Sequence, residues 1–168
     1  MRVPSASAFA LSLTVVLAVG GGCKPDMIPG TTVEDSEENR KVLEFLTRYQ
    51  QAMQNHNADD VVKLCAADYF EDNGNADPTD DYNVDGLRTK LTEHFKMTKE
   101  LTLEVYVQSV ERGGPGKEDV VAVAYRYNTR ALIAFPAGEK WLTATEVNKI
   151  KLRQISDDEA GFRITSGL

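Results

Sequence analysis

The second half of the chain alternates apolar and polar residues with a period of two, which is the pattern of half-buried β-strands. Four such runs are separated by turn clusters at 113–116, 136–139 and 157–161, which are rich in glycine, proline or acidic residues. Strands joined by tight turns pair antiparallel, so residues 101–168 are predicted to form a four-stranded meander. The second run keeps one register over residues 121–135, a length that must bend to fit a small domain.

The third run changes its apolar phase along its length. Its first part is set by Trp141, Thr143, Thr145 and Val147, and its last part by Ile150 and Leu152. A one-residue change of phase is typical of a β-bulge, which we place near Asn148–Lys149. On this interpretation the first part presents one apolar face that contains no acidic residue.

Three stretches before the sheet carry apolar residues at spacings of three and four, the pattern of amphipathic helices. These helices are predicted over residues 36–55, 58–67 and 85–97. Their predicted N-caps are Ser36, Asn57 and Asp85. Because the helices must bury their apolar stripes, they are expected to cover one face of the sheet. The predicted fold class is therefore α+β, with N-terminal helices packed on a strongly bent antiparallel meander.

The first residues are typical of an export signal. Arg2 provides a positive start, residues 9–19 form an apolar run of secretory length, and three glycines precede Cys23. This order resembles the lipobox of bacterial lipoproteins, which implies a signal peptide over 1–22, a diacylglycerol on Cys23 and a lipid-anchored tether over 23–35.

The address that this resemblance implies is the cell envelope. Lys24, directly after the cysteine, favours the outer membrane by the family's sorting rule if the host has one. Gly20 stands where the family usually has leucine, so ordinary cleavage to a secreted or periplasmic soluble protein is the alternative. The second cysteine, Cys65, lies in an apolar run and is predicted to be a buried, inert thiol.

Composition limits the partners. The 168 residues suffice for one domain after a leader, and 26 acidic against 19 basic residues give a net charge of −7. Such a balance, without a basic patch, repels phosphate backbones. Nucleic acid is therefore not expected as a partner.

The order of three helices followed by long, bent antiparallel strands resembles the nuclear transport factor 2-like superfamily, the cone-shaped fold of ketosteroid isomerase and polyketide-cyclase-like proteins. The resemblance covers residues 36–168 and rests on order and pattern. It implies a curved sheet wrapped round the first helix, a pocket at the open end and homodimerisation through the sheet. It implies no chemistry, because such a fold hosts enzymes and inert modules alike.

Candidates for lining such a pocket combine apolar bulk with a polar group. They are Tyr49, His94, Tyr125, Tyr127, Trp141, Thr143 and Thr145. Core packing explains the aromatic members equally well. His94 is interpreted as a neutral histidine at the core or its rim, and no catalytic residue is assigned.

The acidic segment 71–86 contains half of a calcium-binding motif. Residues 81–86 match D-x-N-x-D-G, but the twelfth position of the loop is Thr92 instead of glutamate. The candidate ligands are Asp77, Asp81, Asn83 and Asp85. The alternative is an acidic solvent loop whose side chains turn the chain and cap the next helix.

Three functions from different classes follow. The first is an envelope lipoprotein whose non-catalytic domain binds a small apolar ligand or a protein. The second is a membrane-tethered isomerase or dehydratase-type enzyme with a cone pocket, and the third is a calcium-binding structural or adhesion module. The first is favoured, because no acid–base pair can be placed on the predicted apolar faces.

Overall fold

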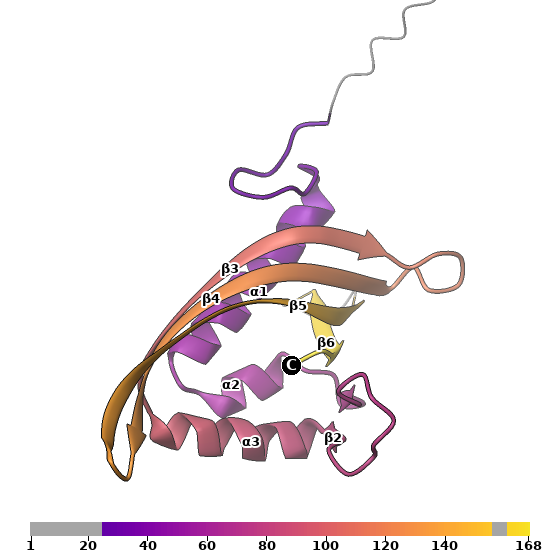
Figure 1. Cartoon of the computed structure of the whole chain (residues 1–168). Helices are drawn as coiled ribbons and strands as arrows, with labels where there is room; N and C mark the ends of the chain where they lie inside the picture. Colours follow the sequence, from indigo (N-terminus) through magenta and orange to yellow (C-terminus); the bar gives the residue numbers. More distant parts are fainter. Residues whose placement is uncertain (1–24, 156–160) are drawn as a thin grey trace, which may run out of the picture.

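The computed structural model describes residues 25–155 and 161–168 (Figure 1). The expected signal peptide, Cys23 and most of the turn cluster at 157–161 lie outside the described residues. The helices are α1 (Glu37–Gln54), α2 (Ala58–Lys63) and α3 (Val84–Met97). The strands are β1 (Phe70–Glu71), β2 (Tyr82–Asn83), β3 (Thr98–Arg112), β4 (Val120–Phe135), β5 (Gly138–Gln154) and β6 (Phe162–Ser166). Within the described ranges no helix has the length and apolar character to cross a bilayer.

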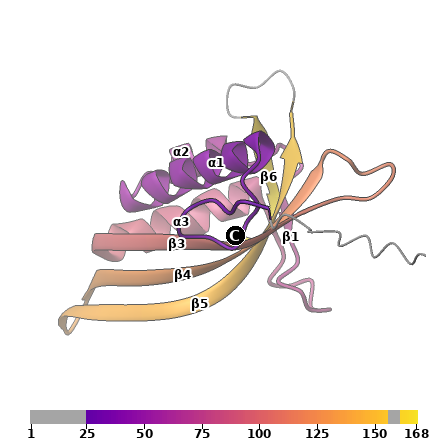
Figure 2. The same cartoon turned by 90° about the horizontal axis from the view of Figure 1, so that it is seen from above.

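The main sheet has the order β3-β4-β5-β6 and is antiparallel throughout, which confirms the predicted meander. Strands of 15 to 17 residues are too long to stay flat in a domain of this size, and the sheet curves strongly along β3, β4 and β5 (Figure 1). Figure 2 shows the three helices on one side of this curved sheet. The α+β prediction is confirmed.

Helix α1 provides much of the core. Val42 and Phe45 on its buried face are completely covered. The rings of Phe45 and Phe162 of β6 pack edge to face, with their centres 5.9 Å apart. Ser36 caps α1 by accepting a hydrogen bond from the Asn39 amide, as predicted. This local cap fixes where α1 starts, and its apolar stripe then fixes which face meets the sheet.

The other two helices differ from prediction at one end each. Helix α2 starts at its predicted cap, Asn57, but ends at Lys63 because the chain leaves it to pair with β6. Cys65 forms a parallel bridge with Ile164, whose amide donates to the Leu64 carbonyl at 2.8 Å. Helix α3 is capped by Asn83, which accepts from two backbone amides, so the prediction of Asp85 as the cap is wrong.

The bulge predicted near Asn148–Lys149 is also wrong. The β4–β5 register is unbroken from Val120↔Arg153 to Phe135↔Gly138, and the irregularity of β5 lies instead against β6, between Lys151 and Leu152. The even-numbered residues of β5 therefore face the concave side along the whole strand. The apolar residues at 141 and 147 do not mark the buried face, because they lie on the outer face, where isolated exposed apolar side chains are common.

Residues 27–35 pack against the domain, contrary to the prediction of a tether through residue 35. Met27 pairs with Glu34, and Val33 is buried at 4% exposure. The Thr32 hydroxyl donates to the Gln108 carbonyl of β3 at 2.5 Å. A buried valine, a bond to the sheet and the bond from the Asp35 amide to the Asp26 carbonyl at 2.7 Å hold this segment in place.

Candidate functional site

The helices cover the concave face of the sheet only in part, and an apolar cavity of about 560 Å³ opens at the uncovered end. It lies between the C-terminal ends of α1 and α3 and the hairpin of β4 and β5. Met97, Phe135 and Leu142 at its rim are 47%, 43% and 41% exposed. An exposed apolar rim around an apolar hollow is the kind of surface that a largely apolar ligand would cover.

A second, more polar cavity of about 210 Å³ continues from the first, because both are lined by Met53, Leu103 and Thr129. Tyrosines and one amide form its other walls: Tyr49 of α1, Tyr125 and Tyr127 of β4, and Asn148 of β5. The two hollows adjoin, and both are mainly apolar, with hydroxyl and amide groups added at the inner end. We call the two together the concave cavity.

Hydrogen bonds fix the inner end. The Asn148 amide nitrogen donates to the Tyr125 hydroxyl at 3.2 Å and to the Gly167 carbonyl at 2.9 Å. Tyr49 and Tyr125 are also hydrogen-bonded to each other. Burial raises the pKa of both phenols above the usual value, so both stay neutral at physiological pH.

Glu146 is a candidate functional residue that the sequence interpretation missed. It pairs with Tyr127 across β4 and β5 on the concave face, and the Tyr127 hydroxyl donates to its carboxylate at 2.7 Å. Burial, with a further contribution from this carboxylate, raises the pKa of Tyr127 to about 12. The sequence contained an indication of this position. Ile150 and Leu152 are apolar and even-numbered, and counting back from them along β5 in steps of two residues reaches Glu146.

The structure gathers five of the seven predicted pocket residues at the concave cavity. Tyr49, Tyr125 and Tyr127 line its inner end, and His94 lines its outer end. Thr143 also borders the outer end, but it pairs with Arg130 on the outer face of the sheet, so it does so from the edge of the strand.

Trp141 and Thr145 do not belong to this group, and their prediction as lining residues is corrected. The unbroken β4–β5 register puts both on the outer face. The Arg130 guanidinium stacks 4.2 Å from the centre of the Trp141 ring, and the Thr145 hydroxyl donates to the Asn128 side chain at 3.0 Å.

The candidate calcium ligands do not form a ligand set. One oxygen of Asp77 accepts bonds from the amide and hydroxyl of Thr79, which lower the pKa of Asp77. The oxygen of Asn83 caps α3, and Asp85 lies 3.7 Å from Arg88. Asp81 joins no group of three or more acidic, histidine or cysteine side chains fit to hold a metal ion, and none occurs elsewhere in the described residues. In the described structure these side chains serve turns, a helix cap and an ion pair within the segment.

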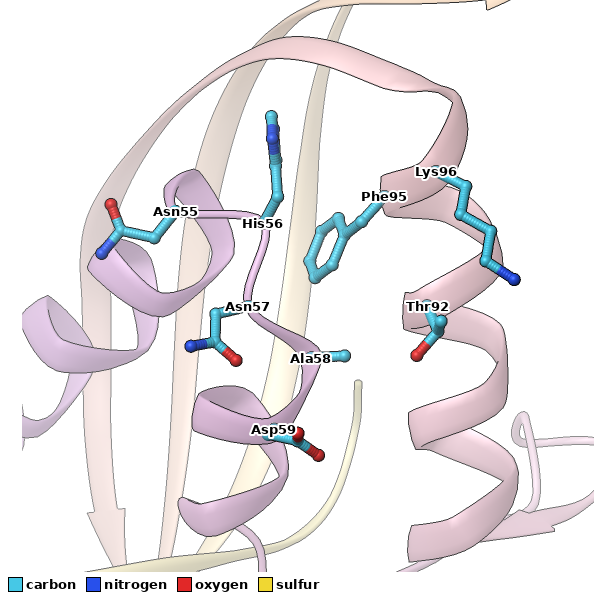
Figure 3. Close-up of a pocket in the computed structure, with 8 residues that line it drawn as sticks. All are labelled: Asn55, His56, Asn57, Ala58, Asp59, Thr92, Phe95 and Lys96. Carbon is cyan, nitrogen blue, oxygen red and sulfur yellow. The ribbon is translucent and has the colours of Figure 1, made fainter.

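Figure 3 shows a polar hollow of about 530 Å³ between the turn that follows α1 and the C-terminal half of α3. His56 in this turn has a left-handed backbone (φ 53°), and its ring lies 5.5 Å from Phe95. Its Nε2 is buried without a hydrogen-bond partner among the described residues. His56 is thus half-buried and not a surface residue as the sequence suggested.

The polar groups around this hollow already serve the fold. Asn57 caps α2, and the Asp59 carboxylate pairs with Arg88 of α3 at 3.1 Å. The hollow is open and polar, whereas the concave cavity is apolar with a few placed polar groups. The concave cavity is therefore the candidate site.

No protein-family model matches this sequence, and no curated protein is similar to it. Solved structures are similar in fold. A conserved protein from Planctomyces limnophilus DSM 3776 superposes with a TM-score of 0.62 at 6% identity, over 77% of this chain and 92% of that chain. A ketosteroid isomerase-like protein from Erwinia carotovora atroseptica superposes with a TM-score of 0.58 at 15% identity, over 79% of this chain and 95% of that chain.

A third similar structure is a protein assigned as a dehydratase of the nuclear transport factor 2-like family from Streptomyces avermitilis. It superposes with a TM-score of 0.57 at 12% identity, over 77% of this chain and 92% of that chain. At these identities the similarity establishes the fold alone. The chain has the nuclear transport factor 2-like fold, which confirms the resemblance noted in the sequence.

Proposed function

We propose that this nuclear transport factor 2-like domain binds a small, largely apolar molecule in the concave cavity without transforming it, and that a lipid on Cys23 holds the protein in a bacterial cell envelope. The observation that carries the ligand-binding proposal is the cavity of about 560 Å³ with its exposed apolar rim. Its volume lies in the range of small-molecule sites. Covering the rim would remove apolar surface from water, which stabilises a complex by about 25 cal/mol per Å².

A non-catalytic role is favoured by the arrangement of titratable groups. Among the described strands, Glu146 is the one carboxylate on the concave face. It is solvent-exposed and hydrogen-bonded to a phenol, and His94 lies at the outer end of the cavity on a different element. General acid–base catalysis needs its acid and base within hydrogen-bond reach of the same reacting atoms. Glu146 and His94 instead lie near different ends of the cavity.

The ligand-binding proposal is tested by filling the cavity. Ala144 is a half-buried lining residue, and Thr145, the next residue, lies on the outer face. We expect Ala144→Trp to weaken binding of the neutral fluorescent probe phenylnaphthylamine by about tenfold or more, because the indole occupies the probe's volume. Thr145→Trp, the matched control, should leave binding unchanged. Equal binding by both variants, or no saturable binding by the unaltered protein, would refute the proposal.

The lipid anchor rests on the order of Arg2, the apolar run at 9–19 and the glycines before Cys23. Its test is expression in a bacterium with alkyne-labelled palmitate, followed by fractionation. We expect the unaltered protein to carry the label and to sediment with membranes, and Cys23→Ala to lose both properties. An unlabelled, soluble protein would instead support ordinary secretion.

A second candidate function, proton transfer as in an isomerase, is favoured by one observation. The phenol of Tyr127, which lines the inner end of the cavity, donates to the Glu146 carboxylate at 2.7 Å on the same face of the sheet. A carboxylate can act as a base and a phenol can stabilise a developing oxyanion. Turnover of a β,γ-unsaturated ketosteroid, followed by absorbance of the conjugated product and abolished by Glu146→Gln, would establish this function in place of simple binding.

A further inference from the structure

We propose that the ligand of the concave cavity is an amphiphile with a positively charged amine, which Glu146 and Tyr127 hold while its apolar part extends toward the rim. This inference rests on the proposed ligand-binding function and adds the chemical class of the ligand. It starts from an exposed carboxylate placed beside an apolar cavity, with a neutral phenol as its hydrogen-bond donor.

Glu146 lies on the concave face of β5 between two residues that line the cavity. Ala144 belongs to the outer end and Asn148 to the inner end, and all three side chains point to the same side because their positions alternate by two. Strand β6 pairs only with residues 151–154 of β5, so β5 is the edge of the sheet at Glu146. The carboxylate therefore stands at the open long side of the cavity, where a head group can reach it.

The charge of Glu146 is not compensated within the protein. No ion pair to this carboxylate occurs in residues 25–155 and 161–168, and its one hydrogen bond comes from a neutral phenol. The surface acids Asp35 and Asp68, by contrast, are each held by an arginine. A cationic ligand would supply the counter-charge that Glu146 lacks.

The hydrogen-bonding pattern selects the same head group. Because Tyr127 donates its proton to Glu146, its oxygen presents lone pairs to the cavity, and the carboxylate presents further lone pairs. This wall therefore offers acceptors. An ammonium is a donor without acceptors and matches it, whereas a carboxylate ligand would bring acceptors and a repelling charge.

The aromatic rings add to this preference. The rings of Tyr125 and Tyr127 have their centres 6.2 Å apart and are tilted by 47°, and both line the inner end. The face of a phenol ring carries negative electrostatic potential and attracts an ammonium within about 6 Å. At the other end, Ile133, Phe135 and Leu142 offer apolar surface only. An alkyl or aryl amine fits both ends of the concave cavity.

The experiment compares head groups on one chain. Decylamine, decanol and decanoate, each below its micelle concentration, compete with phenylnaphthylamine for the purified protein at neutral pH. We expect the amine to bind about fivefold more tightly than the alcohol, and the acid more weakly than both. Raising the salt concentration should weaken binding of the amine and leave binding of the alcohol unchanged, because salt screens only the interaction between charges.

Two variants locate the effect. Glu146→Gln should bring the amine to the affinity of the alcohol. Glu104→Gln is the matched control, because Glu104 also accepts a bond from a tyrosine, Tyr106, but lies on the outer face of β3. It should keep the preference for the amine. If Glu146→Gln fails to fold, Glu146→Ala, which also removes the charge, takes its place and should likewise bring the amine to the affinity of the alcohol.

The outcomes separate this inference from the proposed function. Equal affinities for the three compounds, tightest binding of the acid, or an amine preference that survives Glu146→Gln would overturn the amine proposal while ligand binding stands. If none of the compounds displaces the probe and the probe itself does not saturate, the ligand-binding function fails first. If Glu104→Gln removes the amine preference as well, the preference comes from the overall negative charge and the proposal is wrong.

Discussion

Tyr127 and Glu146 face each other across β4 and β5, and the phenol donates its hydrogen bond to the carboxylate at 2.7 Å. This pair shows that the concave face of β5 is its even-numbered face. It also places a charged group beside a cavity whose lining is largely apolar and phenolic. The proposed ligand class depends on this one relationship.

The core under α1 should depend strongly on Phe45. Its side chain is 0% exposed and packs on Phe162, so Phe45→Ala leaves a cavity and should lower the free energy of unfolding by about 3–5 kcal/mol. Phe70 is 51% exposed, and Phe70→Ala should cost less than about 1 kcal/mol. Urea denaturation of both variants measures the difference. Similar losses would mean that α1 does not pack as described.

The start of α3 separates two candidate caps. The Asn83 oxygen accepts from the amides of Asp85 and Gly86, so Asn83→Ala should destabilise the protein by about 1 kcal/mol. Asp85→Ala removes a charge from the first turn and an exposed ion pair with Arg88, and should cost less, about 0.5 kcal/mol. Denaturation midpoints at constant slope give both values. A larger loss for Asp85→Ala than for Asn83→Ala would restore Asp85 as the cap.

Stability should fall at alkaline pH, in part because of Cys65. Burial raises the pKa of this thiol from 9.0 to about 12, so between these values the unfolded chain loses the proton and the folded chain keeps it. The free energy of unfolding then decreases as pH rises, by up to about 1.4 kcal/mol per pH unit for this one group. Below pH 9 the contribution is fully present.

The comparison of Cys65→Ala with the unaltered protein isolates this thiol. The buried tyrosines lose stability at high pH in both proteins and cancel in the difference. Urea unfolding at about pH 8 and about pH 10 should show a smaller decrease in Cys65→Ala, by about 1.4 kcal/mol. Parallel decreases in the two proteins would show that the thiol is accessible in the folded state.

The last residues of the chain pack too tightly to accept a side chain at Gly167. This glycine has a left-handed backbone (φ 97°), and an added Cβ would lie 2.3 Å from the Lys149 carbonyl oxygen and 2.8 Å from the Ile150 Cα. Gly167→Ala should therefore push the chain end away from β5 and lower stability by about 1–3 kcal/mol. Gly114→Ala has open space and should be close to neutral. Thermal unfolding of the pair tests this, and equal midpoints would contradict the close packing.

Much of the architecture could be read from local patterns. Ser36 and Asn57 cap their helices where the sequence placed them, because a cap needs only the side chain and the next amides along the chain. The meander follows from alternation and short turns, which are also local. The tyrosines of the cavity were predicted because Tyr49, Tyr125 and Tyr127 lie on the apolar phase of their elements.

Long-range contacts decided the features that the sequence interpretation missed. The end of α2 is set by the pairing of Cys65 with Ile164, nearly a hundred residues away in the chain. The burial of Val33 depends on β3 and α1. Neither contact has a local signal, because each depends on where another element passes.

The amino-acid sequence by itself determined the order of the elements, the caps and the antiparallel pairing, because short-range hydrogen bonding and side-chain periodicity specify them. Only the tertiary structure decided which face of the first part of β5 is inside. There neither face of the strand is fully buried, and the even phase of Ile150 and Leu152 extends back to Glu146 only because the pairing with β4 runs on without a bulge. That pairing puts Glu146 on the concave face, beside the cavity, and Trp141 on the outer face.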